Sequence, residues 1–264
     1  MDIPSYFRRL GYEGRAQGDL ATLTALMQRH QQTIPFENLD IFDFGRQIWL
    51  DTAALFQKLV VNRRGGYCFE LNGLFFVLLQ ELGFSCYPVA ARVVMGKTTR
   101  PPLTHRAAVV MLDGGKYYCD VGFGGPGPHG PLRLLADTAQ KVGPDVFLLL
   151  PQGRELVICR RTGNGWEPVL AFEDRPFEEA DFALLNFYCS NSPDVLFTRQ
   201  RVVNLTTEEG HRGILDNRLT VTRAGQSVVT ELDTADALEQ ALEHYFGIRI
   251  SLPQNTGVFG EKRR

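Results

Sequence analysis

The chain has 264 residues, of which 44% are hydrophobic and 22% are charged, and its formal net charge is −2. This composition is typical of a soluble globular protein with one large domain or two to three small ones. A charge so close to zero gives no reason to expect nucleic acid or an anionic membrane as a partner. The first residues lack the pattern of a signal peptide, and no segment is apolar over the length that a membrane span requires.

The cysteines indicate a reducing environment. Their number is odd, they are scattered, and no Cys-x-x-Cys pair occurs, so the sequence predicts neither a disulfide framework nor a thiolate zinc site. We therefore expect a cytoplasmic protein without a bound metal, whose thiols are free to react. The five positions are Cys68, Cys86, Cys119, Cys159 and Cys189.

The first third of the chain has the apolar periodicity of helices. Residues that cap helices precede each periodic run, and the connections are short, which predicts a compact helical bundle up to about Gly83. The expected elements are a helix over 5–10 capped by Ser5, a longer helix capped by Asp19, an extended segment over 41–50, and a helix over 51–62.

The next stretch joins a two-glycine turn, Gly65-Gly66, to a long apolar helix that begins near Cys68 and ends before Gly83. A thiol at a helix start lies close to unpaired N–H groups, and two neighbouring arginines at 63 and 64 add positive charge. Both effects favour the thiolate, which is the reactive form of cysteine. The alternative interpretation is a buried structural cysteine, since free cysteine is among the most buried residue types.

From Cys86 the periodicity changes to that of strands. Short runs rich in β-branched and aromatic residues alternate with Gly-, Asn- and Asp-containing turns, which indicates an antiparallel sheet or a small barrel. We expect strands over 87–95, 106–112, 116–123, 146–150, 155–161 and 166–172, and a helix over 178–188.

The part after about Pro193 mixes both types of element. Four strands are expected over 201–206, 211–215, 218–222 and 228–232, followed by a helix over 234–246 and a tail without periodicity. The three parts together predict an α+β chain divided at about 1–85, 86–192 and 193–264.

A nucleophilic cysteine needs a base and, in many enzymes, a third group that orients the base. Among the five histidines, His105 opens a strand whose partner across the 113–116 turn carries Asp120. If residues 113 and 116 face each other, the two side chains share a face of the hairpin but stand four residues apart in register. That is about 13 Å along the strand, so contact would require a bulge, strong twist or bend. Alternatively, Asp120 is a structural aspartate in an apolar setting.

Several segments resemble the arylamine N-acetyltransferases. The Arg-Gly-Gly-Tyr-Cys-Phe-Glu-Leu-Asn run at 64–72, the Thr-His pair at 104–105 and the Asp-Val-Gly-Phe-Gly run at 120–124 are similar to the Cys, His and Asp segments of that family. The runs at 34–39 and 190–193 match two further signatures. The resemblance extends in order over about residues 5–250.

The resemblance implies a fold of a helical bundle, a central antiparallel β-barrel and a C-terminal α/β lid, with a Cys-His-Asp arrangement like that of cysteine proteases. It also implies that His105 and Asp120 meet despite the register argument. Cys68 would then be the acetylated nucleophile, His105 its base and Asp120 the residue that orients His105. Acetyl-CoA would be the acyl donor, and aromatic amines or hydrazines the acceptors in a ping-pong reaction.

Further site residues follow from the same resemblance. Phe36, Val93 and Phe123, and with less support Phe197, would form the apolar walls for the acceptor, although each can also be a core residue. Backbone at Gly122 and Gly124 would approach the substrate or the pantetheine arm of CoA, or simply form a turn of the barrel. The sequence does not indicate the oligomeric state or the residues that bind the CoA phosphates.

Three other functions share these residues. A Cys-His-Asp hydrolase would use the same three side chains but release an acid to water. An amide synthase of the same family would close macrolactam rings. A binding protein without catalytic activity is a third alternative, and an unreactive Cys68 thiol would favour it.

Overall fold

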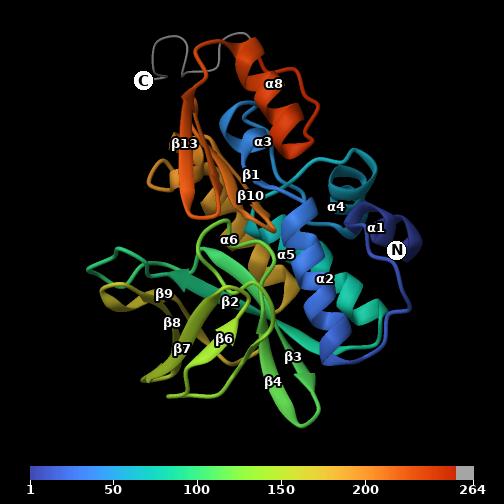
Figure 1. Ribbon diagram of the computed structural model, residues 1–264. Helices are drawn as coiled ribbons and strands as arrows, with labels where there is room; N and C mark the ends of the chain where they lie inside the picture. The colour runs from blue at the N-terminus through green and yellow to red at the C-terminus, as the bar shows by residue number, and fades with distance from the viewer. Residues whose placement is uncertain (254–264) are drawn as a thin grey trace.

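The structure is a computed structural model that describes residues 1–253 (Figure 1). Its N-terminal part contains five α-helices and one π-helical turn, and the cap that was predicted at Asp19 is confirmed, since Asp19 Oδ1 accepts the Thr22 N–H at 2.7 Å. The elements are α1 (Ile3–Leu10), α2 (Leu20–Thr33), α3 (Leu39–Phe42), α4 (Thr52–Phe56), η1 (Gln57–Val61) and α5 (Cys68–Glu81).

Two details of the helical part differ from the sequence-based expectation. Asp2, not Ser5, caps α1, because its carboxylate accepts the Ser5 N–H at 3.1 Å and the helix begins at Ile3. The prediction of an extended segment over 41–50 is wrong for its first residues, which belong to the single helical turn α3. A helix of four residues is too short for its apolar spacing to be recognised in the sequence.

Helix α5 lies at the centre of the largest hydrophobic cluster, which confirms the long apolar helix that the sequence predicts. Eleven of its fourteen residues are buried, so it has no polar face of the kind that most surface helices present to water. Gly83 follows the helix with φ +82°, a conformation that only glycine adopts without strain. The position of Cys68 is therefore fixed by packing along the whole helix.

The middle of the chain forms a nearly closed antiparallel barrel, seen in the lower half of Figure 1. Its strand order is β5-β4-β3-β2-β9-β8-β7-β6, and Val89, Val109, Tyr118 and Phe147 are among the fully buried residues of its apolar cluster. The strands are β2 (Ser85–Val93), β3 (His105–Leu112), β4 (Gly115–Cys119), β5 (Leu132–Arg133), β6 (Gln140–Val142), β7 (Asp145–Gln152), β8 (Glu155–Thr162) and β9 (Gly165–Glu173). All six expected strands are present, whereas β5 and β6 are too short to be predicted.

A second sheet and three helices complete the described chain. The sheet has the order β1-β10-β11-β12-β13, and α8 lies beside it (Figure 1). The buried residues of α8 pack with the sheet in one hydrophobic cluster. The expected strands and the helices α6 and α8 are confirmed. The elements are β1 (Phe36–Glu37), α6 (Glu179–Asn191), α7 (Leu196–Arg199), β10 (Val202–Thr207), β11 (Gly210–Leu215), β12 (Arg218–Arg223), β13 (Gln226–Glu231) and α8 (Ala235–Phe246).

The mixed α+β fold agrees with the expected architecture of bundle, barrel and lid. The boundaries at 85/86 and 192/193 remain predictions, and β1 pairs with β10, so the C-terminal sheet also contains a strand from the N-terminal part. Residues 254–264, which complete the expected third part and include most of the tail, lie outside the described residues. No helix between residues 1 and 253 is long and apolar enough to cross a bilayer.

Candidate active site

The turn before α5 is held by close backbone packing and by ion pairs. A Cβ atom on Gly65 would lie 2.1 Å from the Pro35 carbonyl oxygen, so only glycine fits there. The Glu70 carboxylate accepts the Tyr67 N–H at 3.0 Å and thereby caps the first turn of the helix. These contacts fix the direction in which Cys68 leaves the turn.

Charged side chains beneath this turn neutralise each other. Lys58 Nζ lies 2.7 Å from both Asp40 Oδ2 and Glu70 Oε1, and Arg64 lies 2.6 Å from Glu37 Oε1. Arg64 was expected to add positive charge beside Cys68, but its guanidinium is turned towards Glu37. Its charge therefore supports the turn more than the thiol.

Cys68 is the first residue of α5 and is 2% exposed. Its Sγ atom lies 3.7 Å from the Thr104 carbonyl oxygen, next to His105, and the backbone N–H groups of Arg106 and Phe69 lie close enough to favour its ionised form. Burial raises the pKa of the Cys68 thiol, and these two N–H groups oppose the rise only in part. The sequence predicted a thiol that ionises readily; the buried site instead makes ionisation dependent on a base.

His105 and Asp120 are in contact, at 2.6 Å between Nε2 and Oδ2, and both are buried. The predicted separation of about 13 Å is wrong because the turn is placed one residue earlier. Leu112 pairs with Gly115, and Asp113 and Gly114 have φ of +50° and +70°, as a two-residue type I′ turn requires. The register then sets Asp120 two residues from His105, just beyond the end of β4.

The Asp120 carboxylate is held by four polar groups. Its Oδ1 accepts the Asn72 amide at 2.9 Å and the Gly122 N–H at 3.0 Å, and its Oδ2 accepts the Tyr118 hydroxyl at 3.0 Å as well as facing His105. Burial alone would raise the pKa of Asp120, but the His105 ring and these hydrogen bonds outweigh it and hold the pKa below its ordinary value. Asp120 is therefore ionised at neutral pH.

Asn72 is a site residue that the sequence reasoning missed. Its Nδ2 also donates to the Arg106 carbonyl at 2.6 Å, and its Oδ1 accepts the Val121 N–H at 2.8 Å. One side chain thus connects the helix of Cys68 with the strand of His105 and the segment of Asp120. The available signal was its position four residues after Cys68, on the same face of α5.

The aromatic residues that were expected as acceptor walls form two groups. Phe123 lies against the His105 ring at 5.4 Å between centroids, and Val93 packs, like Phe123, against the apolar cluster of the barrel. The ring centroids of Phe36 and Phe197 lie 5.8 Å apart, and the Phe197 ring also contacts Tyr67 beside the candidate nucleophile. Phe123, Phe197 and Val93 are only partly buried, which leaves them available to a ligand.

The two glycines that were expected to face a cofactor make close contacts within the protein. A Cβ atom on Gly122 would lie 3.1 Å from the Cα atom of Cys68, and one on Gly124, which has φ +67°, would lie 2.6 Å from the Phe36 ring. Glycine is therefore required here for packing of this segment against α5 and Phe36. Their contact with a cofactor remains a prediction.

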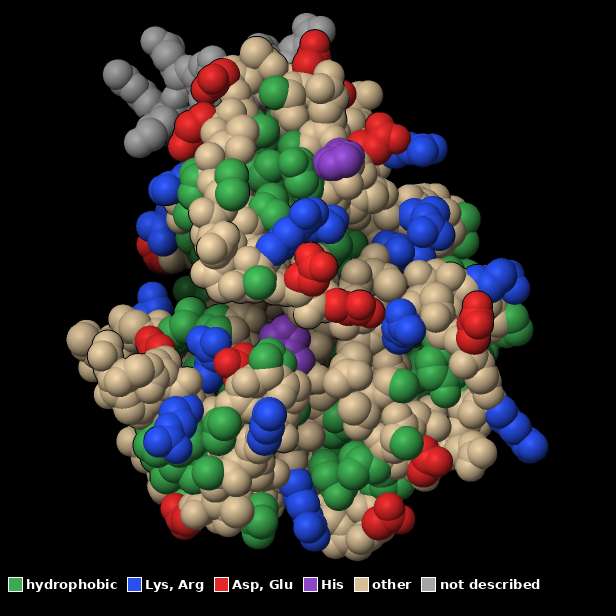
Figure 2. All heavy atoms as spheres, viewed as in Figure 1, with side chains coloured by type: hydrophobic (Ala, Val, Ile, Leu, Met, Phe, Trp, Pro, Cys, Tyr) green, Lys and Arg blue, Asp and Glu red, His purple; other side chains and the backbone are tan. Residues whose placement is uncertain are grey.

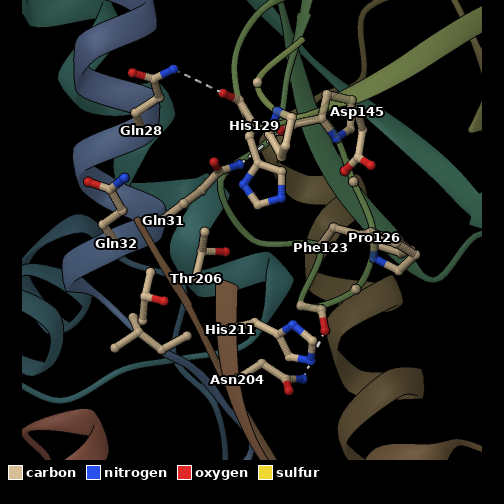
Figure 3. A pocket seen from close by; sticks show the side chains of 18 of the residues that line it. Gln28, Gln31, Gln32, Phe123, Pro126, His129, Asp145, Asn204, Thr206 and His211 are labelled. Atoms are coloured by element: carbon tan, nitrogen blue, oxygen red, sulfur yellow. Dashed lines mark hydrogen bonds between the residues drawn. The ribbon is translucent and has the colours of Figure 1, made fainter. Parts of the chain in front are cut away.

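A cleft of about 940 Å³ lies behind the Asp120–Phe123 segment, between α2, the loop 124–130 and β10–β11 (Figure 3). Gln31 lines it and donates through Nε2 to the carbonyl oxygens of Asp120 and Pro128, at 2.9 and 3.0 Å. The space-filling view shows histidine side chains in a hollow between the barrel and the part of the molecule that carries α8 (Figure 2). Within residues 1–253, no group of His, Cys, Asp or Glu side chains is arranged to hold a metal ion.

Known proteins of one family are similar to this chain in sequence and in fold. A family model described as N-acetyltransferase matches residues 19–255. The chain is 34% identical over 253 residues to an arylamine N-acetyltransferase of Mycolicibacterium smegmatis, covering 94% of this chain and 92% of the relative. It is 36% identical over 213 residues to that of Escherichia coli strain K12, covering 80% and 75%.

Solved structures give the same result. The arylamine N-acetyltransferase of Salmonella typhimurium superposes with a TM-score of 0.89 at 31% identity, covering 93% of this chain and 90% of that one. The Mycobacterium marinum enzyme in complex with CoA has a TM-score of 0.87 at 31% identity, covering 94% and 93%. Fold and sequence matches together define an acyltransferase. The chain belongs to the arylamine N-acetyltransferase family.

Proposed function

We propose that this protein transfers the acetyl group of acetyl-CoA to arylamines and arylhydrazines, including xenobiotic ones, through an acetyl-cysteine on Cys68. The observation that carries the proposal is the buried His105–Asp120 pair, at 2.6 Å, beside a cysteine whose sulfur lies 3.7 Å from the Thr104 carbonyl. Relatives named for this activity, and a related enzyme in complex with CoA, support the choice of substrates.

In the first half of the reaction, His105 takes the Cys68 proton. A base is needed because burial raises the pKa of the thiol. The ionised Asp120 stabilises the resulting imidazolium and holds its Nε2–H, which leaves Nδ1 to exchange the proton. The thiolate attacks the thioester carbonyl of acetyl-CoA, and CoA leaves as a thiol after it takes the proton from His105.

In the second half, the amine attacks the carbonyl of the acetyl-cysteine. His105 accepts the proton that the amine loses and returns it to the sulfur of Cys68 as the amide departs. Both tetrahedral intermediates carry an oxyanion, and the Cys68 N–H in the first turn of α5 is a donor that can stabilise it. Phe123 beside His105 and Phe197 beside Tyr67 would supply apolar contacts for the aromatic ring.

The proposed location is the cytoplasm, since all five cysteines are free. An acyl-enzyme is compatible with hydrolysis and with macrolactam formation, so the acceptor distinguishes these functions. A transferase releases CoA in proportion to added arylamine, whereas a hydrolase releases CoA and acetate without one.

Mass spectrometry of the protein after incubation with acetyl-CoA tests the intermediate. We expect one acetyl group on the peptide that contains Cys68 and none after Cys68→Ala. Cys189 is an internal control, because its sulfur also lies 3.7 Å from the Thr104 carbonyl, but Cys189 is in the last turn of α6 whereas Cys68 is at the start of a helix. An acetyl group on Cys189, or none on either cysteine, would contradict the assignment.

A further inference from the structure

Arg106 follows His105 on β3, and both its backbone and its side chain lie close to the helix of Cys68. Its backbone N–H lies close enough to the sulfur of Cys68 to favour the thiolate, and its carbonyl accepts the Asn72 amide at 2.6 Å. Because side chains alternate along a strand, its guanidinium lies on the face opposite His105, towards α5. The backbone of one residue thus supports the thiol while its side chain brings a charge to the same helix.

The guanidinium is enclosed by α5 and α6. Its side chain is 1% exposed, and its Cζ atom lies 4.4 Å from the centroid of the Phe182 ring. Its Nη1 lies 3.4 Å from the position of a Cβ atom on Gly73, five residues after Cys68, or about 7.5 Å along the helix axis. Its Nε has no hydrogen-bond partner among residues 1–253. The charge is therefore buried within Coulombic range of the thiol.

The counter-charge of Arg106 is located at the surface. Glu179, in the first turn of α6, accepts from Nη1 and Nη2 at 3.0 and 2.5 Å, but its own side chain is 58% exposed. Water screens the carboxylate much more than the guanidinium. Glu179 therefore cancels the field of Arg106 inside the protein only in part.

Arg106 differs from every other titratable group near the sulfur. Tyr67 and Glu70 on the turn and helix of Cys68, Cys189 on α6, and Tyr118 and Asp120 on the β4 side are acids that disfavour a thiolate when ionised. His105 carries a positive charge only after it has taken a proton. Within the described chain, Arg106 is the permanent cation of this set.

We propose that Arg106 is an electrostatic positioning residue that stabilises the Cys68 thiolate, and that Glu179 moderates its effect from the surface. The inference rests on the proposed role of Cys68 as nucleophile. The rise of about 7.5 Å between Cys68 and Gly73 sets the scale of the separation, and a full charge at such a distance in an effective dielectric of about 20 would shift the pKa of a thiol by about 1.5 units. With partial compensation by Glu179, we expect about one unit.

The test is the rate at which iodoacetamide alkylates Cys68 as a function of pH, quantified on the Cys68 peptide in the full-length protein. Arg106→Met should raise the pKa of Cys68 by about one unit and slow alkylation about tenfold at pH values below that pKa. Arg106→Lys should restore most of the wild-type profile. Glu179→Gln should move the profile to lower pH, because it removes the compensating charge and keeps the side-chain shape.

Arg175→Met is the control for loss of a surface cation. Arg175 stacks on Phe177 at 4.3 Å and pairs with Glu173 at 3.0 Å, but its side chain is 56% exposed, so water screens its charge. Its profile should be that of the wild type. Thermal denaturation of each variant identifies loss of stability, and Arg106→Lys, which keeps the charge, separates that loss from loss of charge.

The inference would be overturned if an Arg106→Met protein that thermal denaturation shows to be folded had the wild-type pH profile of alkylation. It would also be overturned if Glu179→Gln moved that profile to higher pH. This result is distinct from failure of the proposed function, which would appear as a wild-type protein that forms no acetyl-cysteine on Cys68. Alkylation does not require acetyl transfer, so each experiment can fail without the other.

Discussion

Replacement of Asp120 by asparagine tests whether this carboxylate sets the tautomer of His105. The side chain keeps its shape but has one acceptor atom instead of two. Its oxygen fits best at the Oδ1 position, where two N–H groups from Asn72 and Gly122 converge. Its NH2 group then occupies the Oδ2 position and points towards the Nε2 atom of His105.

The consequence is a change of tautomer. Nε2 can now only accept, so the ring proton moves to Nδ1, the nitrogen that must be free to take the Cys68 proton. The loss of a correctly oriented base and of the negative charge that stabilises the imidazolium costs about 10³- to 10⁴-fold in kcat/KM by analogy with other triads. The fold should persist, because the Tyr118 hydroxyl can rotate and accept from the new NH2 group.

The assay is stopped-flow formation of the acetyl-cysteine together with steady-state CoA release in the presence of an arylamine. Both rates should fall by the same factor, because His105 takes a proton in each half of the reaction. Thermal denaturation serves as the control for folding. Activity within tenfold of the wild type in a folded Asp120→Asn protein would refute the reasoning and would make Asp120 a structural residue.

Two further predictions concern stability. Gly122→Ala should lower the free energy of unfolding by about 1–3 kcal/mol, because the new Cβ would lie about 3 Å from Leu71, Asn72 and Cys68; Gly163→Ala, where no atom lies within 4 Å, is the control in thermal denaturation. Burial lowers the pKa of His30 to about 3, so only the unfolded chain takes up a proton as the pH falls from about 6.5 towards 3. Urea titrations should therefore show stability lost over that range, with a smaller loss in His30→Gln; an equal loss in both proteins would contradict the assignment.

The sequence predicted the elements that carry strong local patterns. Helix α5 has an apolar spacing that no other structure accommodates, and Asp19 precedes α2 in a typical capping position. The approach of His105 to Asp120 was expected only from the family resemblance, and the order of the strands was not predicted. Local pattern alone placed these two residues too far apart.

The correct hairpin register could have been predicted from the residues of the turn itself. Asp113-Gly114 is a favoured pair for a type I′ turn, whereas the prediction centred the turn on Gly114-Gly115. A shift of one residue in the turn moves every cross-strand pair by two, which is half of the predicted separation. Turn chemistry was therefore the missing information at this position.

Other features of the site depend on contacts between distant parts of the chain. Asn72 reaches Asp120 across 48 residues of sequence, and Arg64 turns away from Cys68 because Glu37 lies beneath it. Burial of Cys68 likewise results from several elements packed together. A single sequence contains no pattern for such contacts, since neither spacing nor composition relates the partners.

The two-residue strand β1 connects the beginning and the end of the chain. Phe36 pairs with Asn204 of β10 on one side and forms a bridge to Gly66 on the other, and the Glu37 N–H donates to the Gly66 carbonyl. Asn38 extends this connection, because its Oδ1 accepts the Val202 N–H at 2.7 Å. During synthesis, a chain that ends before β10 lacks the strand that pairs with β1, and β1 in turn contacts the turn that positions Cys68. The contacts that support the position of the candidate nucleophile, in the first third of the chain, are therefore complete only after β10 has been made.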